Sequence, residues 1–226
     1  MKRGLVIALD GPSGVGKTTV SRLLAERLNL KYINTGAMYR ALALAADEAG
    51  VNVADEEALE GFCKTVDLGF DDASGNIIID RKDYSKDIRT QRAGTLASVS
   101  SAKRPVRELL VKFQRTLGER GGVVMEGRDI GTVVFPDADM KFFLDASHEV
   151  RAQRRHLEIE GKAKDTKEAV SAEIQERDKR DSERKNSPLK KADDAVYIDT
   201  GGLTIEEVVQ KALDEVEKAG FIKEGK

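Results

Sequence analysis

The stretch Gly11-Pro12-Ser13-Gly14-Val15-Gly16-Lys17-Thr18 decides the fold, because its spacing matches that of a phosphate-binding loop. The apolar run Leu5–Leu9 precedes it, and the apolar positions after it have the spacing of one helix face: Val20, Leu23, Leu24 and Leu28. A strand, a glycine loop and a helix are the context in which G-x-x-x-x-G-K-[ST] is interpreted as a P-loop. The alternative is a tight strand-to-helix turn without a ligand, and the flanking elements favour the P-loop.

The residue types in this loop suit a nucleoside triphosphate. Glycines let successive N–H groups turn toward one anion, and the start of the helix adds a partial positive charge. Lys17 can reach the β- and γ-phosphates, and the Thr18 hydroxyl can ligate Mg²⁺. The residues that we expect to bind the triphosphate here are Gly11, Pro12, Ser13, Gly14, Val15, Gly16, Lys17, Thr18 and Thr19.

Composition limits the remaining classes of function. The 226 residues suit one core with a smaller appendage, and 38 basic against 40 acidic residues give a net charge of −2. This balance gives no overall field that would favour nucleic acid. The single cysteine, Cys63, fits a reducing compartment, and no apolar stretch approaches the length of a membrane span. We expect a cytoplasmic protein that binds neither nucleic acid nor membranes.

Short apolar runs alternate with helical patterns along most of the chain. The predicted strands are Leu5–Leu9, Lys31–Asn34, Val123–Met125, Phe142–Leu144 and Val196–Ile198. The last three are continuous runs, which indicates strands buried on both faces. One predicted helix starts directly after the P-loop. The other predicted helices are Thr35–Gly50, Asp55–Lys64, Thr90–Ser101, Pro105–Glu119, two helices within Ser147–Lys191 joined near Gly161–Thr166, and Thr204–Ala219. The pattern predicts an α/β fold with a doubly wound, five-stranded parallel sheet.

Residues 65–88 have a different character. Val66–Phe70 and Ile77–Ile79 flank a turn rich in Asp, Ser, Gly and Asn, which predicts a small antiparallel hairpin inserted into the fold. We expect one domain over 1–226, with this insertion inside a segment at 35–105 and a helical lid at about 148–187.

Right-handed crossovers place the loops after the parallel strands at one edge of the sheet. Glu126 ends a predicted buried strand close to the P-loop and is therefore a candidate for holding Mg²⁺. Arg128 and Asp129 follow between glycines, where they can contact phosphates. The alternative is that Arg128 and Asp129 form a surface pair that stabilises a turn.

Two groups of arginines lie in the charged region. Arg177, Asp181 and Arg184 are spaced i, i+4 and i+7, so they share one helix face and suit a sugar joined to a phosphate. Arg151, Arg154 and Arg155, with the loop at 161–164, suggest a mobile lid that carries basic groups over the phosphates. A solvated, charged helix is the alternative for both groups.

With these residues in view, the chain resembles the bacterial cytidylate kinases, nucleoside monophosphate kinases of the P-loop superfamily. The resemblance covers essentially the whole length. The motifs that carry it are Asp10 to Gly14, Thr35-Gly36-Ala37-Met38-Tyr39-Arg40, Arg89-Thr90-Gln91, Glu126 to Pro136, and Glu176-Arg177-Asp178 through Asp181.

The resemblance implies transfer of the γ-phosphoryl group of ATP to CMP, and to dCMP, giving CDP or dCDP and ADP. It implies Mg²⁺ as the cofactor, a monomer, and a monophosphate-binding role for 35–105. The acceptor oxygen is already an anion at neutral pH, so the reaction needs charge neutralisation, alignment and exclusion of water rather than a general base.

The resemblance also implies roles for individual residues. Ser98, Arg107 and Asp129 would face the cytosine. Arg40, Arg128 and Arg184 would hold the acceptor phosphate, and Lys17, Arg128 and Arg184 would be the catalytic cations. Arg177 and Asp181 would meet the ribose, with Tyr39 nearby and Thr35 supplying a hydroxyl. Some members have Ser in place of Thr35, and either residue supplies the hydroxyl. Some members have Asp in place of Glu126, so the contact of Glu126 with Mg²⁺ could be direct or through water.

Two other functions use the same loop. A kinase that acts on a small-molecule hydroxyl would need a carboxylate base, for which Asp129 is available. A GTPase-like switch would read guanine with [NT]-K-x-D, and the nearest sequence, Lys190-Lys191-Ala192-Asp193, lacks the Asn or Thr.

Overall fold

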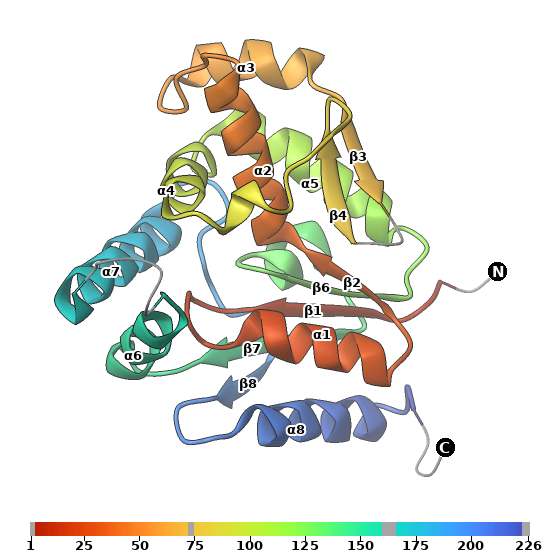
Figure 1. Cartoon of the computed structure of the whole chain (residues 1–226). Helices are drawn as coiled ribbons and strands as arrows, with labels where there is room; N and C mark the ends of the chain where they lie inside the picture. The colour runs from red at the N-terminus through yellow and green to blue at the C-terminus, as the bar shows by residue number, and fades with distance from the viewer. Residues whose placement is uncertain (1–2, 72–74, 160–165, 223–226) are drawn as a thin grey trace. The chain divides into compact units, whose positions relative to one another are not determined.

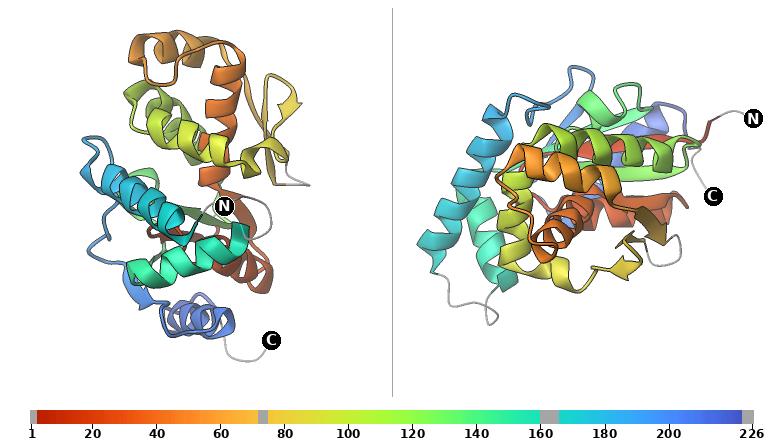
Figure 2. Two further views of the ribbon diagram at one scale, coloured as in Figure 1. Left: turned by 60° about the vertical axis from the view of Figure 1, so that its left-hand side comes forward. Right: turned by 90° about the horizontal axis from the view of Figure 1, so that it is seen from above.

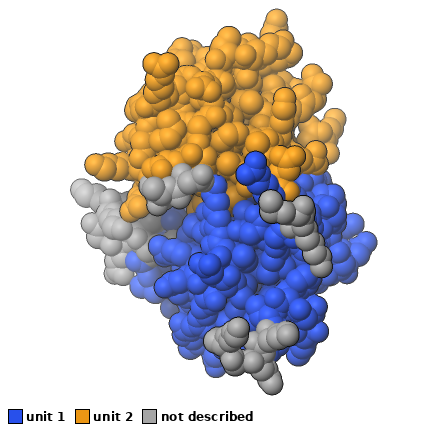
Figure 3. All heavy atoms as spheres, turned by 90° about the vertical axis from the view of Figure 1, so that its right-hand side faces the viewer, with its two compact units in different colours: residues 1–32, 120–183, 187–226 blue, residues 33–119, 184–186 orange. Residues whose placement is uncertain are grey.

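The computed structural model describes residues 3–71, 75–159 and 166–222. The chain divides into two compact units, coloured separately in Figure 3: unit 1 comprises residues 1–32, 120–183 and 187–226, and unit 2 comprises 33–119 and 184–186. Most of the predicted hairpin turn, at 72–74, and of the predicted loop between the lid helices, at 160–165, lies outside the described residues. Within the described ranges, no helix is both long enough and apolar enough to cross a bilayer.

The five-stranded sheet predicted from the sequence is confirmed. Its strands are β1 (Val6–Asp10), β2 (Lys31–Asn34), β6 (Val123–Gly127), β7 (Met140–Asp145) and β8 (Val196–Asp199). They lie in the order β2-β6-β1-β7-β8, and β1 pairs in parallel with both β6 and β7. The strand that leads into the P-loop is therefore the central strand, and the loop after β6 starts beside it.

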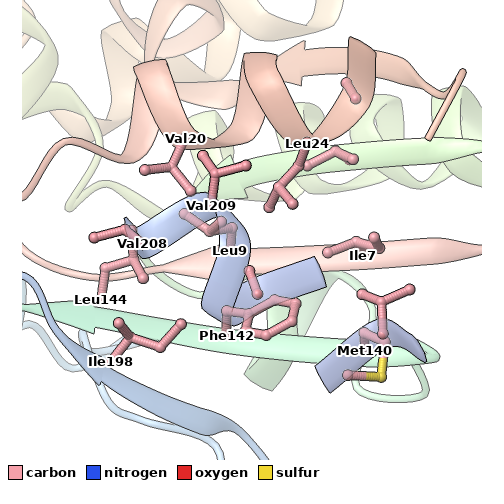
Figure 4. Close-up of a cluster of buried hydrophobic side chains, with 14 of the residues drawn as sticks. Ile7, Leu9, Val20, Leu24, Met140, Phe142, Leu144, Ile198, Val208 and Val209 are labelled. Atoms are coloured by element: carbon pink, nitrogen blue, oxygen red, sulfur yellow. The ribbon is translucent and has the colours of Figure 1, made fainter. Parts of the chain in front are cut away.

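Unit 1 also contains α1 (Lys17–Arg27), α6 (His148–Ile159), α7 (Lys167–Glu183) and α8 (Ile205–Lys218). Helices α1 and α8 contact each other (Figure 1), and their apolar side chains meet those of β1 and β7 in the core shown in Figure 4. The residues labelled there include Val20, Leu24, Val208, Val209, Leu9 and Phe142. Helices α6 and α7 pack along each other (Figure 2) around a smaller cluster of Ala152, Val170 and Ile174.

The prediction that β8 is buried on both faces is wrong. This strand lies at the edge of the sheet and pairs with β7. Tyr197 is 53% exposed and stacks on Phe143, with ring centroids 6.4 Å apart, while Ile198 points into the core. A run of three apolar residues can therefore form an edge strand, because its aromatic member covers a neighbouring strand instead of lying in the core.

Two further details of unit 1 differ from the predictions. Residues Ile130–Val134 form a π-helical turn directly after β6, which the sequence pattern did not indicate. Helix α7 ends at Glu183, one residue before Arg184, which the predicted helix included together with Arg177 and Asp181. Ser187 has a φ of 54° and precedes Pro188, and both features are typical of the chain just beyond a helix end.

Unit 2 contains α2 (Thr35–Glu48), α3 (Glu56–Thr65), the 3₁₀ turn Asp87–Arg89, α4 (Gln91–Ser100) and α5 (Arg104–Gly118). The predicted N-cap Asp55 is confirmed, since its carboxylate accepts from the backbone N–H groups of Glu57 and Ala58. Helix α2 contacts α4 and α5, and α3 contacts α5.

The inserted hairpin is confirmed and carries a third strand. Strands β3 (Leu68–Asp71), β4 (Asn76–Ile79) and β5 (Lys82–Asp83) form a small antiparallel sheet. The turn between β4 and β5 is Asp80-Arg81, and both residues have positive φ, of 47° and 68°. Two-residue hairpin turns of this kind are normally indicated by Asn-Gly or Asp-Gly, which explains why β5 was not predicted.

The predicted capping box of α8 is confirmed and allows a stability test. Thr204 Oγ1 accepts from the backbone N–H of Glu207 at 3.3 Å, and Glu207 Oε2 accepts from the backbone N–H of Thr204 at 2.8 Å. Thr204→Ala should lower the free energy of unfolding by about 1 kcal/mol, and the Tm by about 2–4 °C, in thermal and urea unfolding. Thr204→Ser keeps the hydroxyl and serves as the control. An alanine variant as stable as the serine variant would contradict the capping role.

Candidate active site

The P-loop follows the central strand β1 in a conformation that its glycines allow. Gly11 has a φ of 148°, and a Cβ added there would lie 2.1 Å from the carbonyl oxygen of Leu144 in β7. No other residue fits at this position, so the loop can lie directly against the carboxyl end of β7. Helix α1 then begins at Lys17, with the first N–H groups of the helix at the loop.

Lys17 is buried in this loop and is 7% exposed. Its Nζ donates to the carbonyl oxygen of Pro12 at 2.5 Å. Burial, followed by the charge of the Arg128 guanidinium, lowers the pKa of Lys17 well below its ordinary value of 10.5, although the Glu126 carboxylate opposes this shift. Lys17 is therefore buried beside a second cation, an arrangement that an anionic ligand at the loop would stabilise.

Thr18, in the first turn of α1, meets Glu126 near the end of β6. The Thr18 hydroxyl donates to the Glu126 carboxylate, at 2.9 Å from Oε1 and 3.2 Å from Oε2. Tyr32 lies in β2, at the end of the first segment of unit 1, and it also donates its hydroxyl to Glu126 Oε1. The sequence analysis did not identify Tyr32, because nothing in the order of the strands along the chain indicates that β2 lies beside β6.

These oxygen donors fit Mg²⁺. Magnesium in phosphoryl-transfer sites is held by one or two protein oxygens together with substrate phosphates, rather than by a cage of protein ligands. No cluster of three or more His, Cys, Asp or Glu side chains able to hold a metal occurs among the residues that the structure describes. A hydroxyl and one buried carboxylate beside the P-loop are the set that Mg²⁺ with a triphosphate would use.

The loop after β6 is held by Asp10, the last residue of β1. The two carboxylate oxygens of Asp10 accept from the backbone N–H groups of Ile130 at 2.9 Å and Gly131 at 2.8 Å. Burial raises the pKa of Asp10 to about 6, against the effect of these two hydrogen bonds. Asp129 is 4% exposed, so the alternative that Arg128 and Asp129 are a surface pair is wrong.

Arg128 contacts the predicted ribose ligand Asp181 instead. Its Nε donates to Asp181 Oδ2 at 2.9 Å, and both side chains are largely buried. The backbone carbonyl of Asp181 also accepts from the N–H of Leu189 at 2.7 Å. Asp181 is therefore not on a solvated helix face, and the structure brings a predicted phosphate ligand and a predicted sugar ligand into direct contact.

Two of the three arginines of α6 are tied to the P-loop. Arg151 is buried and donates to the carbonyl oxygens of Ser13 and Ala146, and it pairs with Asp178 of α7. It anchors α6 in this structure and is not an exposed basic group. Arg154 donates from both terminal nitrogens to Thr200, whose hydroxyl donates to the carbonyl oxygen of Val15. Arg154 is thus connected to the P-loop through Thr200.

Unit 2 groups most of the predicted acceptor residues. Thr35 is buried at the first position of α2. A Cβ added to Gly36 would lie 3.2 Å from Arg40 Nη1, so the Arg40 guanidinium lies against the start of this helix. The Arg107 guanidinium is buried, 5.7 Å from the centroid of the Tyr39 ring.

Ser98 and Arg107 are joined through Ser101. The Ser101 hydroxyl donates to the Ser98 carbonyl oxygen at 3.3 Å, and Arg107 Nη1 donates to the Ser101 carbonyl oxygen at 3.4 Å. The Ser98 hydroxyl is buried and has no hydrogen-bond partner among the described parts of the chain. Buried hydroxyls normally have a hydrogen-bond partner, so the Ser98 hydroxyl suits a polar ligand. Arg184 also belongs to unit 2, and convergence of these residues with Arg128, Asp129, Arg177 and Asp181 of unit 1 stays a prediction.

Known proteins were compared with the chain at the level of sequence and of fold. The profile of the family described as "Cytidylate kinase" matches residues 7–218. A "Cytidylate kinase" from Bacillus pumilus (strain SAFR-032) is 48% identical over 221 residues, 96% of this chain and 98% of that protein. One from Geobacter sp. (strain M21) is 47% identical over 212 residues, 92% of this chain and 91% of that protein.

One solved structure shares the fold at low sequence identity. An uncharacterized protein from Eubacterium ventriosum ATCC 27560 superimposes with a TM-score of 0.54 at 14% identity, over 96% of this chain and 99% of that chain. The profile match and the two relatives extend over nearly the whole length that carries the P-loop, the loop after β6 and the acceptor residues. The chain therefore belongs to the cytidylate kinase family.

Proposed function

We propose that this protein transfers the γ-phosphoryl group of ATP to CMP, and to dCMP, giving CDP or dCDP and ADP. The observation that carries the proposal is the meeting of Thr18 and Glu126 beside the buried Lys17, at the carboxyl ends of β1 and β6. This arrangement provides a cation, a hydroxyl and a carboxylate at one point, which is what transfer of a phosphoryl group from a Mg²⁺-bound triphosphate requires.

The donor half of the site is the P-loop with Arg154. The backbone of Gly11 to Thr19 would hold the triphosphate, and Lys17 would neutralise charge on the transferred group. Mg²⁺, held by Thr18 and by Glu126 directly or through water, supplies charge neutralisation at the phosphates. Arg154 would cover the nucleotide from α6.

The acceptor half takes its residues from both units. Arg40, Arg128 and Arg184 would hold the CMP phosphate, and with Lys17 they would stabilise the transition state. Arg177 and Asp181 would bind the ribose, with Tyr39 and Thr35 beside them. Ser98, Arg107 and Asp129 would bind the cytosine. Because the attacking phosphate oxygen is already ionised, no residue needs to remove a proton.

We also propose how the chain is organised for this reaction. Segment 35–105 is the monophosphate-binding part, and residues 148–187 form a lid that excludes water on closing. The protein works as a cytoplasmic monomer, without a nucleic-acid or membrane partner.

An assay of ADP formation tests the function directly. CMP, dCMP, UMP and AMP are offered with ATP and Mg²⁺, together with a panel of small alcohols and sugars. We expect turnover with CMP and dCMP at least tenfold above that with UMP or AMP. Turnover with a hydroxyl acceptor and none with CMP would favour a small-molecule kinase that uses Asp129 as its base.

Lys17→Met should separate catalysis from stability. Removing one preorganised charge-stabilising group costs about 3–4 kcal/mol, so kcat/KM should fall by a factor on the order of a few hundred. Because burial lowers the pKa of Lys17 below 10.5, the unfolded chain binds the proton more tightly than the folded protein does, and the charged lysine destabilises the protein at neutral pH.

The same variant should therefore have an unchanged or higher Tm at pH 7, and the gain should shrink as the pH approaches 10.5. Activity and thermal unfolding are measured side by side, with Lys211→Met as the control, since Lys211 is exposed on α8. A Tm well below that of the control at pH 7 would show that Lys17 stabilises the fold.

Asp181→Asn tests recognition of the sugar. The variant keeps the size of the side chain but removes the charge that binds Arg128, so the KM for CMP should rise by about tenfold or more, and the ratio of CMP to dCMP efficiency should change. Glu183→Gln removes an exposed charge two residues away and is the control. An unchanged KM and an unchanged ratio would exclude a sugar-binding role for Asp181.

Asp129→Asn tests recognition of the base. A carboxylate accepts from the cytosine amino group, whereas uracil presents a carbonyl there. Each unpaired buried group costs roughly 1–3 kcal/mol, so the preference for CMP should be on the order of a hundredfold when Arg107 also contributes, and should narrow in the variant. The measurement is kcat/KM for CMP and UMP at saturating ATP. Equal losses for both nucleotides would place base selection elsewhere.

A further inference from the structure

Asp10 is a buried carboxylate to which the reaction itself gives no task. It does not need to touch either substrate, yet both of its oxygens are used: Oδ1 accepts from the N–H of Ile130 and Oδ2 from the N–H of Gly131. These two N–H groups are the first of the π-helical turn Ile130–Val134. The first N–H groups of any helical turn lack partners within the turn, so a group outside it must accept from them when they are buried.

The turn is fitted closely around this contact. A Cβ added to Gly131 would lie 3.2 Å from Lys141 Cδ and 3.5 Å from Asp10 Oδ2, so the backbone of the turn lies directly against both side chains. Lys141 holds the other end of the segment, since its Nζ donates to the carbonyl oxygen of Pro136 at 2.5 Å. Inside the turn, the N–H groups of Val133 and Val134 donate to the carbonyl oxygen of Asp129.

The position of Asp10 in the sheet determines which two segments this contact joins. Asp10 ends β1, lies opposite Gly127 in the register with β6, and immediately precedes Gly11 of the P-loop. One side chain therefore links the strand that leads into the donor loop to the loop that carries Arg128 and Asp129.

We propose that Asp10 is a positioning residue that fixes the loop carrying Arg128 and Asp129 to the base of the P-loop, and so aligns the acceptor nucleotide with the donor. This inference rests on the proposed acceptor roles of Arg128 and Asp129. The Asp10 carboxylate supplies a separate acceptor oxygen to each of two consecutive N–H groups. An asparagine would offer one oxygen and turn its own N–H₂ toward the second N–H, which would release one side of the turn.

Asp10→Asn should therefore impair use of CMP more than use of ATP. We expect the KM for CMP to rise by about tenfold or more and kcat to fall, because small displacements of positioning groups have large effects on rate. The KM for ATP should stay within about threefold. Hydrogen exchange at the amides of Ile130 and Gly131 should be faster by at least tenfold, a readout that needs no activity.

Asp139→Asn is the matched control. Asp139 also accepts from a backbone N–H of β1, that of Val6 at 2.8 Å, but at the opposite end of the strand. The Asp139→Asn variant should leave both KM values and the exchange at 130–131 unchanged. If Asp10→Asn does not fold, Asp10→Glu keeps both oxygens on a longer side chain, and should raise the KM for CMP and speed exchange at 130–131, each to a smaller extent.

Three outcomes would overturn the proposal. These are equal rises in KM for CMP and ATP, an unchanged KM for CMP, and exchange at 130–131 as slow as in the parent protein. If exchange accelerates as expected but CMP is no substrate of the parent protein, the positioning of the loop stands and the proposed function fails. The two are thus distinguished by one set of measurements.

Discussion

The contact of Gly11 with the Leu144 carbonyl oxygen is the constraint on which the donor site depends. The backbone of the P-loop can approach β7 this closely because position 11 has no Cβ, and a Cβ would lie 2.1 Å from that oxygen. The close approach allows the chain to leave the central strand, turn around the loop and start α1 within six residues. Lys17 and Thr18 then begin the helix beside the end of β6, where Glu126 accepts from Thr18. The site is therefore built at the one edge where β1 and β6 end together.

This arrangement concentrates charge at a cost to the fold. Lys17 is buried near the positive charges of Arg128 and Arg177, and the carboxylates of Glu126 and Asp10 only partly compensate for them. A protein under selection for stability alone would not bury an ammonium group here. The cost is consistent with a site whose full complement of charge includes an anionic ligand, since a polyphosphate would reverse the sign of the local field.

Most of the helices and strands could be predicted from hydrophobic periodicity and local capping signals. Features that depend on contacts between residues far apart in the sequence could not be predicted. Asp55 and Thr204 could be identified as caps because the groups that they bind lie two or three residues away. The two carboxylates that organise the edge of the sheet could not be assigned partners, because Asp10 contacts Ile130 across 120 positions and Glu126 contacts Tyr32 across 94. Burial of β8 was predicted wrongly, since a run of apolar residues does not state which strand lies at the edge.

The contact between Arg128 and Asp181 couples two residues for which we propose separate recognition roles. Arg128 lies in the loop after β6, and Asp181 lies in the last turn of α7, yet their side chains bond at 2.9 Å. Asp178, one turn earlier in α7, pairs with Arg151, which also binds the carbonyl oxygen of Ser13 in the P-loop. Helix α7 is thus tied at one turn to the donor loop and at the next to the loop after β6. A displacement of α7 would change both contacts together, so the phosphate and sugar binding that we propose for Arg128 and Asp181 would depend on the geometry of the P-loop.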